Sequence, residues 1–138
     1  MNVQRFLMAF LAVFVTFGIV YVGAELIFES QFKSVGDAMN FADEEHMISW
    51  VGRILYSLVF CYIFVQGYEN TGVGEGVRYG LLIGLLLIGL DLDWFGVTNV
   101  VLSDAVTWWV TDLAAAIIGG AVLAAVYKPR SETEATVE

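Results

Sequence analysis

Four long blocks of apolar residues dominate this 138-residue chain and restrict what it can fold into. The first block, residues 6–24, contains only two polar side chains, Thr16 and Tyr21. The others contain a single charged residue each and cover residues 48–65, 77–90 and 105–127. A helix needs about 20 mostly apolar residues to cross the hydrocarbon core of a bilayer, and the third block reaches that length with its flanking residues. The pattern predicts four membrane-spanning helices.

Composition agrees with this interpretation. Hydrophobic residues make up 59% of the chain and charged residues only 15%, too few to cover the surface of a soluble domain. We expect an all-α fold, an integral membrane four-helix bundle, in one domain over residues 1–130. An acidic segment, residues 131–138, would follow as a disordered tail. The spans are expected at about residues 6–28, 47–65, 76–95 and 105–127.

The first block has an alternative interpretation as a signal peptide. A small-x-small pattern precedes Glu25, as at a cleavage site. The apolar stretch is longer than the usual hydrophobic region of a signal peptide, so a retained span is favoured.

Basic residues predict the orientation of the bundle. They flank the chain ends and the start of the third span, at Arg5, Arg78, Lys128 and Arg130. The loop of residues 29–46 holds only Lys33 among five acids, and residues 96–104 hold no basic residue. Lys and Arg accumulate on the cytoplasmic side of a membrane. We therefore expect a multi-pass protein of a bacterial inner membrane with both termini in the cytoplasm.

The loop between the first two spans contains a short helical pattern. Ser34 with Asp37 resembles a capping box. Apolar residues recur at helical spacing at Val35, Ala38, Met39 and Ala42. Both an interfacial helix beginning near Ser34 and a partly ordered loop fit this pattern.

A glycine-rich stretch, GVGEGVRYG over residues 72–80, raises the question of a phosphate-binding loop. It lacks the Gly-Lys-Ser/Thr ending and the G-x-G-x-x-G spacing of nucleotide fingerprints, and a membrane span precedes it in place of a strand. Gly72 and Gly74 are therefore interpreted as turn residues.

The later glycines predict helix packing. Gly76, Gly80 and Gly84 recur every four residues, which places them on one helix face. Small residues at this spacing let helix backbones approach closely in a membrane. The fourth span offers a matching face of Ala116, Gly120 and Ala124. The expected contact joins the third and fourth spans, with homodimerisation through the same face as the rival.

Three segments also resemble a known group of proteins. They are YIFVQGYE at 62–69, GEGVRYGLLIGLL at 74–86 and VYKP at 126–129. Together they are similar to a group of small, uncharacterised four-helix proteins of bacterial inner membranes. The resemblance implies the same membrane fold and brings no activity with it.

Charged residues at the outer ends of the spans form the candidate site. With the predicted topology, five residues lie at similar depth: Glu25, Arg53, Asp91, Asp93 and Asp112. A single charge facing lipid costs a few kcal/mol, so such residues usually face the bundle and pair. Arg53 with Asp112 is the first choice of pair, with Glu25 as a further acceptor. The cluster either fixes the helix arrangement or forms a pocket for a cation, a proton or a small polar ligand.

The remaining chemical features predict no catalytic centre and no cofactor. Trp50, Trp94, Trp108 and Trp109 fit an aromatic belt at the outer interface, with a stacking site as the alternative. His46, beside acids, is a weak candidate metal ligand, and Cys61 fits an apolar packing position. Six basic residues against 15 acidic ones argue against nucleic acid as a partner.

We therefore expect a membrane protein without enzymatic activity, with the lipid bilayer as its surroundings. The first hypothesis is a structural or accessory protein that acts in a homo-oligomer or in a larger membrane complex. The alternative is a small transporter or a ligand- or cation-binding protein that uses the outer polar cluster.

Overall fold

The computed structural model describes residues 2–38 and 47–127, and these ranges contain helices and no strands. The helices are α1 Val3–Ile27, α2 Glu29–Ala38, α3 Met47–Gln66, α4 Val73–Phe95 and α5 Leu102–Val126. Four of them, α1, α3, α4 and α5, are long and apolar enough to cross a membrane. The expected all-helical four-span fold is confirmed. His46, Met39, Ala42, Lys128, Arg130 and the expected tail 131–138 lie outside the described residues.

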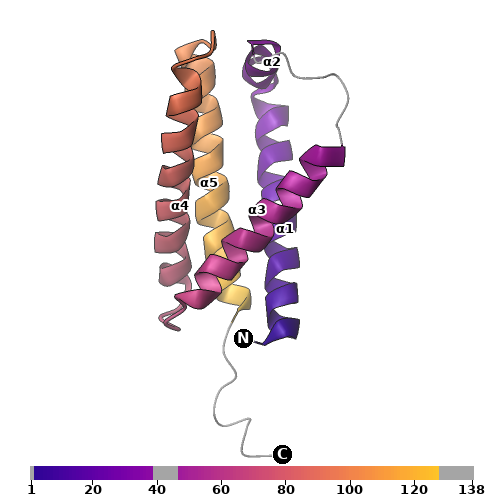
Figure 1. Ribbon diagram of the computed structural model, residues 1–138, viewed down its shortest axis with the longest axis vertical. Coiled ribbons are helices and arrows are strands. Elements are labelled where there is room, and N and C mark those ends of the chain that lie inside the picture. Colours follow the sequence, from indigo (N-terminus) through magenta and orange to yellow (C-terminus); the bar gives the residue numbers. More distant parts are fainter. Residues whose placement is uncertain (1, 39–46, 128–138) are drawn as a thin grey trace, which may run out of the picture.

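Among the spans, α5 contacts both α4 and α1 (Figure 1). Helices α4 and α5 run antiparallel side by side, and α1 packs on the other side of α5. Helix α3 crosses in front of α1 at a steep angle, from the upper right to the lower left. The start of α1 and the end of α5 lie at the lower end, while α2 and the connection between α4 and α5 lie at the upper end.

The helix ends are set by local capping groups. The side chain of Asn2 accepts a hydrogen bond from the backbone N–H of Arg5, so α1 begins at Val3. Gly72 precedes α4 with a φ of +94°, a conformation that glycine adopts without strain. Helix α4 begins at Val73, so Gly74 lies within its first turn and is not a turn residue as the sequence suggested.

The carboxylate of Glu75 accounts for this early start of α4. It accepts hydrogen bonds from the backbone N–H of Glu69 at 2.6 Å and of Thr71 at 2.9 Å. The same carboxylate accepts from the hydroxyl of Thr71 at 3.1 Å. These bonds fold the preceding loop back onto the first turn of α4.

Helix α2 starts five residues earlier than the predicted interfacial helix. It begins at Glu29, separated from α1 by Phe28 alone, and not near Ser34. Tertiary packing explains the difference, because the ring of Phe32 stacks on Trp108 of α5 at a centroid distance of 5.4 Å. Val35 is 2% exposed in a small cluster with Val100 and Ala105. Helix α2 is thereby anchored to the start of α5.

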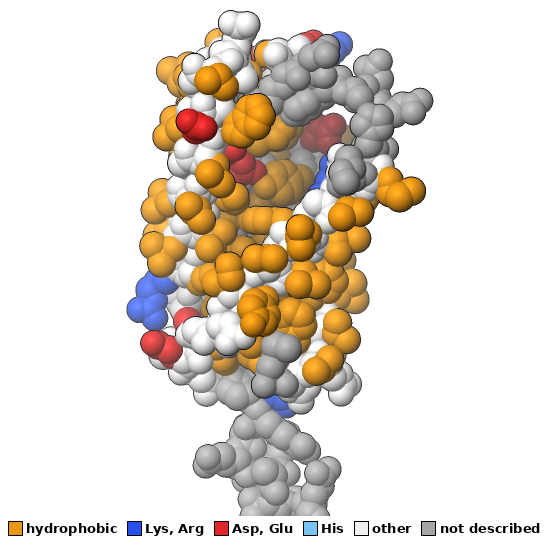
Figure 2. All heavy atoms as spheres, in the orientation of Figure 1, with side chains coloured by type: hydrophobic (Ala, Val, Ile, Leu, Met, Phe, Trp, Pro, Cys, Tyr) orange, Lys and Arg blue, Asp and Glu red, His pale blue; other side chains and the backbone are white. Residues whose placement is uncertain are grey.

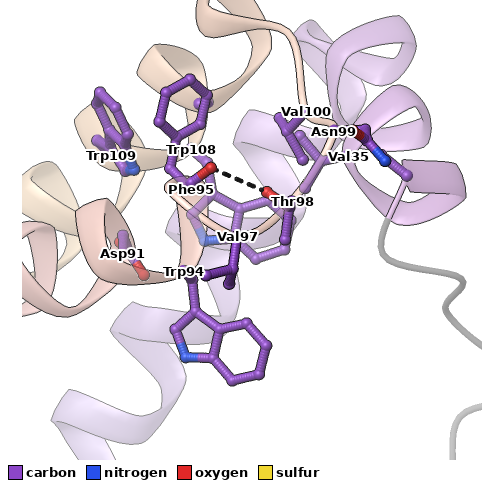
Figure 3. Close-up of a pocket in the computed structure, with 12 residues that line it drawn as sticks. Val35, Asp91, Trp94, Phe95, Val97, Thr98, Asn99, Val100, Trp108 and Trp109 are labelled. Carbon is purple, nitrogen blue, oxygen red and sulfur yellow. Dashed lines mark hydrogen bonds between the residues drawn. The ribbon is translucent and has the colours of Figure 1, made fainter.

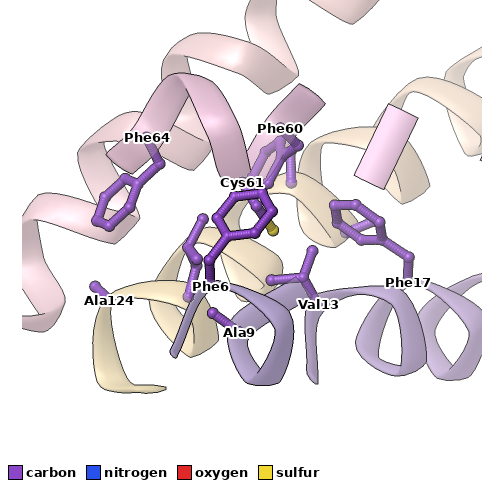
Figure 4. Packing of buried hydrophobic residues seen from close by; sticks show 11 residues of the cluster. Phe6, Ala9, Val13, Phe17, Phe60, Cys61, Phe64 and Ala124 are labelled. Atoms are coloured by element: carbon purple, nitrogen blue, oxygen red, sulfur yellow. The ribbon is translucent and has the colours of Figure 1, made fainter. Parts of the chain in front are cut away.

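The main core lies where α1, α3 and α5 meet (Figure 4). One face of α1 presents Phe6, Ala9, Val13 and Phe17, which are all buried. The ring of Phe17 meets the ring of Phe60 from α3 edge-on, at 5.2 Å between centroids. Cys61 is fully buried in the same cluster, in the apolar environment that such a side chain favours.

Helices α4 and α5 meet through backbone atoms. Gly76, Gly80 and Gly84 are all buried on the face of α4 that contacts α5. A Cβ atom at Gly76 would collide with the carbonyl oxygen of Gly120, and one at Gly80 with that of Ala116. We call this contact the glycine contact. It depends on the absence of side chains, because a methyl group has no room there.

Outward-facing side chains are largely apolar along the length of the bundle (Figure 2). The exposed set includes Ile19, Leu26, Leu55, Leu82 and Leu86. In water such a surface would aggregate, whereas lipid tails solvate it well. The fold is therefore that of a multi-pass helical membrane protein.

Candidate functional site

Asp112 lies near the middle of α5, and it is only 6% exposed. The hydroxyl of Tyr21, from α1, donates a hydrogen bond to its carboxylate. The indole of Trp108, one turn earlier in α5, lies beside the same carboxylate. The carboxyl group of Asp91, from α4, lies within hydrogen-bonding reach of Asp112. Asp91 and Asp112 are called the carboxyl pair below.

The glycine contact positions this pair. Gly84, the upper glycine of α4, packs against Leu113, the residue that follows Asp112 in α5. Asp91 lies seven residues after Gly84, about two helical turns, and therefore on the same side of α4. Close approach of the two backbones at Gly84 thus brings the two carboxyl groups together just above it.

The carboxyl pair is incompletely satisfied by the described residues. Asp112 accepts a hydrogen bond from Tyr21, whereas the Oδ2 atom of Asp91 is buried and has no hydrogen-bond partner among the described residues. Two ionised carboxylates are both acceptors, so they can share a hydrogen bond only if one carries a proton. A buried polar atom without a partner costs about 1–3 kcal/mol. The arrangement therefore calls for a proton or another positive group beside Asp91.

A cavity of about 570 Å³ opens beside Asp91 (Figure 3). Its walls come from α2, the end of α4, the α4–α5 connection and the start of α5. Asp91 is the one charged side chain among the described residues that line it. Four aromatic residues line it as well, Trp94, Phe95, Trp108 and Trp109, and the ring of Trp94 extends away from the others. We call this the aromatic cavity.

The structure brings together two of the five residues predicted for the polar cluster, Asp91 and Asp112. Glu25 and Asp93 are exposed. Arg53 is exposed on α3, with its guanidinium carbon 4.9 Å from the ring centre of Trp50. The contacts of Asp112 come from Tyr21, Trp108 and Asp91 and do not include Arg53. Acidic side chains and a basic side chain lie around a recess in the upper half of Figure 2.

Sequence reasoning missed Tyr21 and Trp108 as partners of Asp112. Both carried a signal. Tyr21 is one of two polar side chains in the first apolar block, and Trp108 lies four residues before Asp112 on the same helix face. Tyr56 of α3 also lies near Asp112. All four spans therefore contribute a residue to the surroundings of this carboxylate.

Metal binding finds little support in the described part of the chain. It contains no group of three or more His, Cys, Asp or Glu side chains that could hold an ion. His46 lies outside the described residues. The carboxyl pair alone offers fewer ligands than Zn²⁺ or Ca²⁺ requires.

Comparison of the chain with protein-family models, with curated proteins and with solved structures finds no match. The fold and the site define a class nevertheless. It is a multi-pass helical membrane protein in which a buried carboxyl group, Asp112, adjoins a half-buried one, Asp91, that lines an aromatic cavity.

Proposed function

We propose that this protein binds a cation at the carboxyl pair in exchange for a proton. The proposal rests on one observation at Asp91. Its Oδ2 atom is buried and has no partner among the described residues, and its carboxyl group adjoins that of Asp112. Two like charges about 4 Å apart repel by about 4 kcal/mol at an effective dielectric constant of about 20. A positive charge at this point removes the repulsion.

A proton and a cation would then compete for the same place. With a proton on the pair, one carboxyl group donates to the other and the pair carries one negative charge in place of two. With a cation bound, both carboxylates are ionised and the proton leaves. Binding and proton release are linked, so the apparent affinity for the cation rises with pH, by up to about tenfold per pH unit.

Other ionisable groups around the pair support a cation over an anion. Tyr21 and Tyr56 face Asp112 from α1 and α3, and both are neutral near pH 7 in their ordinary state. Arg53, the one basic residue of the predicted cluster, lies over the ring of Trp50. The local charge of the pair is therefore negative when it holds no proton.

The proposed location is a bacterial inner membrane with both termini in the cytoplasm. Arg5 lies in the first turn of α1 and Arg78 in the second turn of α4, and both helices begin at the lower end (Figure 1). Basic residues favour the cytoplasmic side. The aromatic cavity, at the upper end, would then open toward the outside.

The test is a proton-release measurement on purified protein in detergent. A pH indicator in weak buffer reports protons as NaCl, KCl or choline chloride is added. At least one cation should release protons from the wild-type protein. Asp91→Asn and Asp112→Asn should abolish the release, whereas Asp93→Asn, an exposed carboxylate two residues from Asp91, should retain it.

Two results would overturn the proposal. One is the absence of proton release with every cation tested. The other is release that survives in Asp91→Asn and Asp112→Asn. Each variant should first be shown to elute at the size of the wild-type protein, so that loss of release is not confused with loss of the fold.

A structural or accessory role in a homo-oligomer or larger complex is the second candidate. The observation that favours it is the upper half of α3, which crosses α1 and leaves Trp50, Val51, Ile54 and Leu55 exposed. Such a surface fits a second protein as well as lipid. Purification from native membranes in mild detergent, followed by native mass spectrometry, tests this role, and a mass of one chain with bound lipid only would contradict it.

A further inference from the structure

We infer that the aromatic cavity receives a carbon-substituted ammonium group, whose positive charge lies against Asp91. This inference rests on the proposed cation exchange and names the chemical class of the cation. The cavity, its aromatic walls and its single carboxylate carry the argument.

Size separates an organic cation from an inorganic one. The cavity measures about 570 Å³, within the range of about 300–1,000 Å³ typical of small-molecule sites. A water molecule or a bare ion of similar size needs only about 30 Å³. An inorganic ion would leave most of this space to be filled by something else.

The chemistry of the walls points the same way. Hard cations such as Ca²⁺ take about six to eight oxygen ligands. Among the described lining residues, side-chain oxygens come from Asp91, Thr98 and Asn99 only. Four of the lining residues are aromatic instead, and the negative face of an aromatic ring attracts an ammonium group within about 6 Å of its centre.

The aromatic walls are held in place before any ligand arrives. The ring of Trp109 meets Phe95 edge-on at 5.6 Å, and that of Trp108 stacks on Phe32 at 5.4 Å. Rings that are already ordered lose little entropy on binding, which favours affinity.

Charge complementarity completes the argument. Asp91 is the charged side chain of the described lining, and it adjoins a second carboxylate that Tyr21 and Trp108 stabilise. One ammonium group beside Asp91 replaces one proton of the pair, so the charge balances. The group could belong to a free molecule such as choline or to the headgroup of a choline lipid, since both present the same chemistry.

The experiment compares choline with its neutral isostere, 3,3-dimethyl-1-butanol, and with NaCl. Binding is followed by tryptophan fluorescence and by proton release at pH 7 and pH 8. Choline should bind at least tenfold more tightly than the neutral isostere, and more tightly at pH 8. A neutral isostere that binds as well as choline would overturn the inference.

Matched tryptophan variants place the ligand. Trp94→Leu changes a cavity residue that is 63% exposed and therefore tolerant of substitution, and it should weaken choline binding about tenfold. Trp50→Leu changes a tryptophan outside the cavity lining and should leave the affinity unchanged. Equal effects of the two variants would contradict the placement.

The outcomes separate this inference from the proposed function. If NaCl releases the proton and choline does not, the ammonium inference fails and cation exchange stands. If no cation releases a proton, both fail. Nanodiscs of phosphatidylcholine and of phosphatidylglycerol identify the source, because a choline headgroup in the bilayer should compete with free choline only in the former.

Discussion

Helices α4 and α5 meet in two different ways along their length. In the lower half Gly76 and Gly80 bring backbone against backbone, with no room for a methyl group. In the upper half the same helices carry the buried Asp112, and Asp91 lines a cavity of about 570 Å³ together with large aromatic rings. In the lower half, the absence of side chains fixes the distance between α4 and α5 and their relative rotation. In the upper half, this fixed geometry holds the polar groups in place.

The comparison separates scaffold from site within one helix pair. A binding group works best when rigid elements hold it within a fraction of an ångström of its productive position. The glycine contact supplies this rigidity, because its backbone atoms cannot shift without losing van der Waals contact. Predictions that disturb one half while sparing the other test the division.

The largest expected effect is a difference in cysteine labelling between the two ends of the bundle, because the two ends should lie on opposite sides of the membrane. In a Cys61→Ser background, Val97→Cys marks the upper end and Thr71→Cys the lower end, and both positions are exposed. A membrane-impermeant maleimide should label the first in intact cells and the second only after the membrane is opened. Labelling of both cysteines from the same side would contradict the proposal that the aromatic cavity opens toward the outside.

The next effect is on stability at the glycine contact. Gly80→Leu places a side chain where a Cβ already meets the backbone of Ala116, and we expect a loss of at least about 3 kcal/mol in the free energy of unfolding. Gly89→Leu is the matched control on the same helix, because a Cβ there has no atom within 4 Å. It should be neutral or slightly stabilising, since glycine is a poor helix former.

Unfolding in detergent with increasing SDS, followed by circular dichroism, measures both variants. The expected pattern is a large loss of stability for Gly80→Leu and no loss for Gly89→Leu. A loss of similar size in both would mean that α4 is sensitive to bulk along its whole length, and the distinction between the two halves would lose its basis.

The sequence predicted those features of the fold that follow from the hydropathy or the spacing of residues. Apolar blocks predicted the four spans, and the spacing of Gly76, Gly80 and Gly84 placed these residues on one helix face, which in the structure meets α5. Asp91 and Asp112 were predicted to belong to a polar cluster because the spans contain few charged residues, and charged residues in a span usually face the interior of the bundle.

The sequence was uninformative about rotation and tilt. Helix α3 is apolar nearly all round, so hydropathy does not say which side of it faces the bundle. Arg53 was therefore assigned to Asp112, whereas the structure directs it to Trp50. Tyr21 became visible as a partner of Asp112 only when α1 and α5 were placed side by side.

A smaller effect is expected at the carboxyl pair. Tyr21→Phe removes the hydroxyl that donates to Asp112 and should lower the free energy of unfolding by about 1.5–3 kcal/mol, the range for hydrogen bonds to charged groups. Tyr62→Phe is the control, because Tyr62 is exposed on α3, and it should change stability by less than about 0.5 kcal/mol. A neutral result for Tyr21→Phe would contradict the role of Tyr21 as a donor to Asp112.

The smallest effect on the free energy of unfolding is expected for a Tyr→Phe substitution in the lower half of the bundle, at Tyr79. The hydroxyl of Tyr79 donates to the backbone carbonyl of Phe60 at 2.6 Å, and its ring lies 4.8 Å from that of Phe60. Tyr79→Phe keeps the ring contact and removes one bond to a neutral acceptor, so the loss should be about 0.5–1.5 kcal/mol. The difference between the losses at Tyr21 and Tyr79 reports the charge of Asp112, because only an ionised acceptor strengthens the bond. Equal losses near pH 7 would mean that Asp112 is neutral there, and the proton of the pair would then belong to Asp112 and not to Asp91.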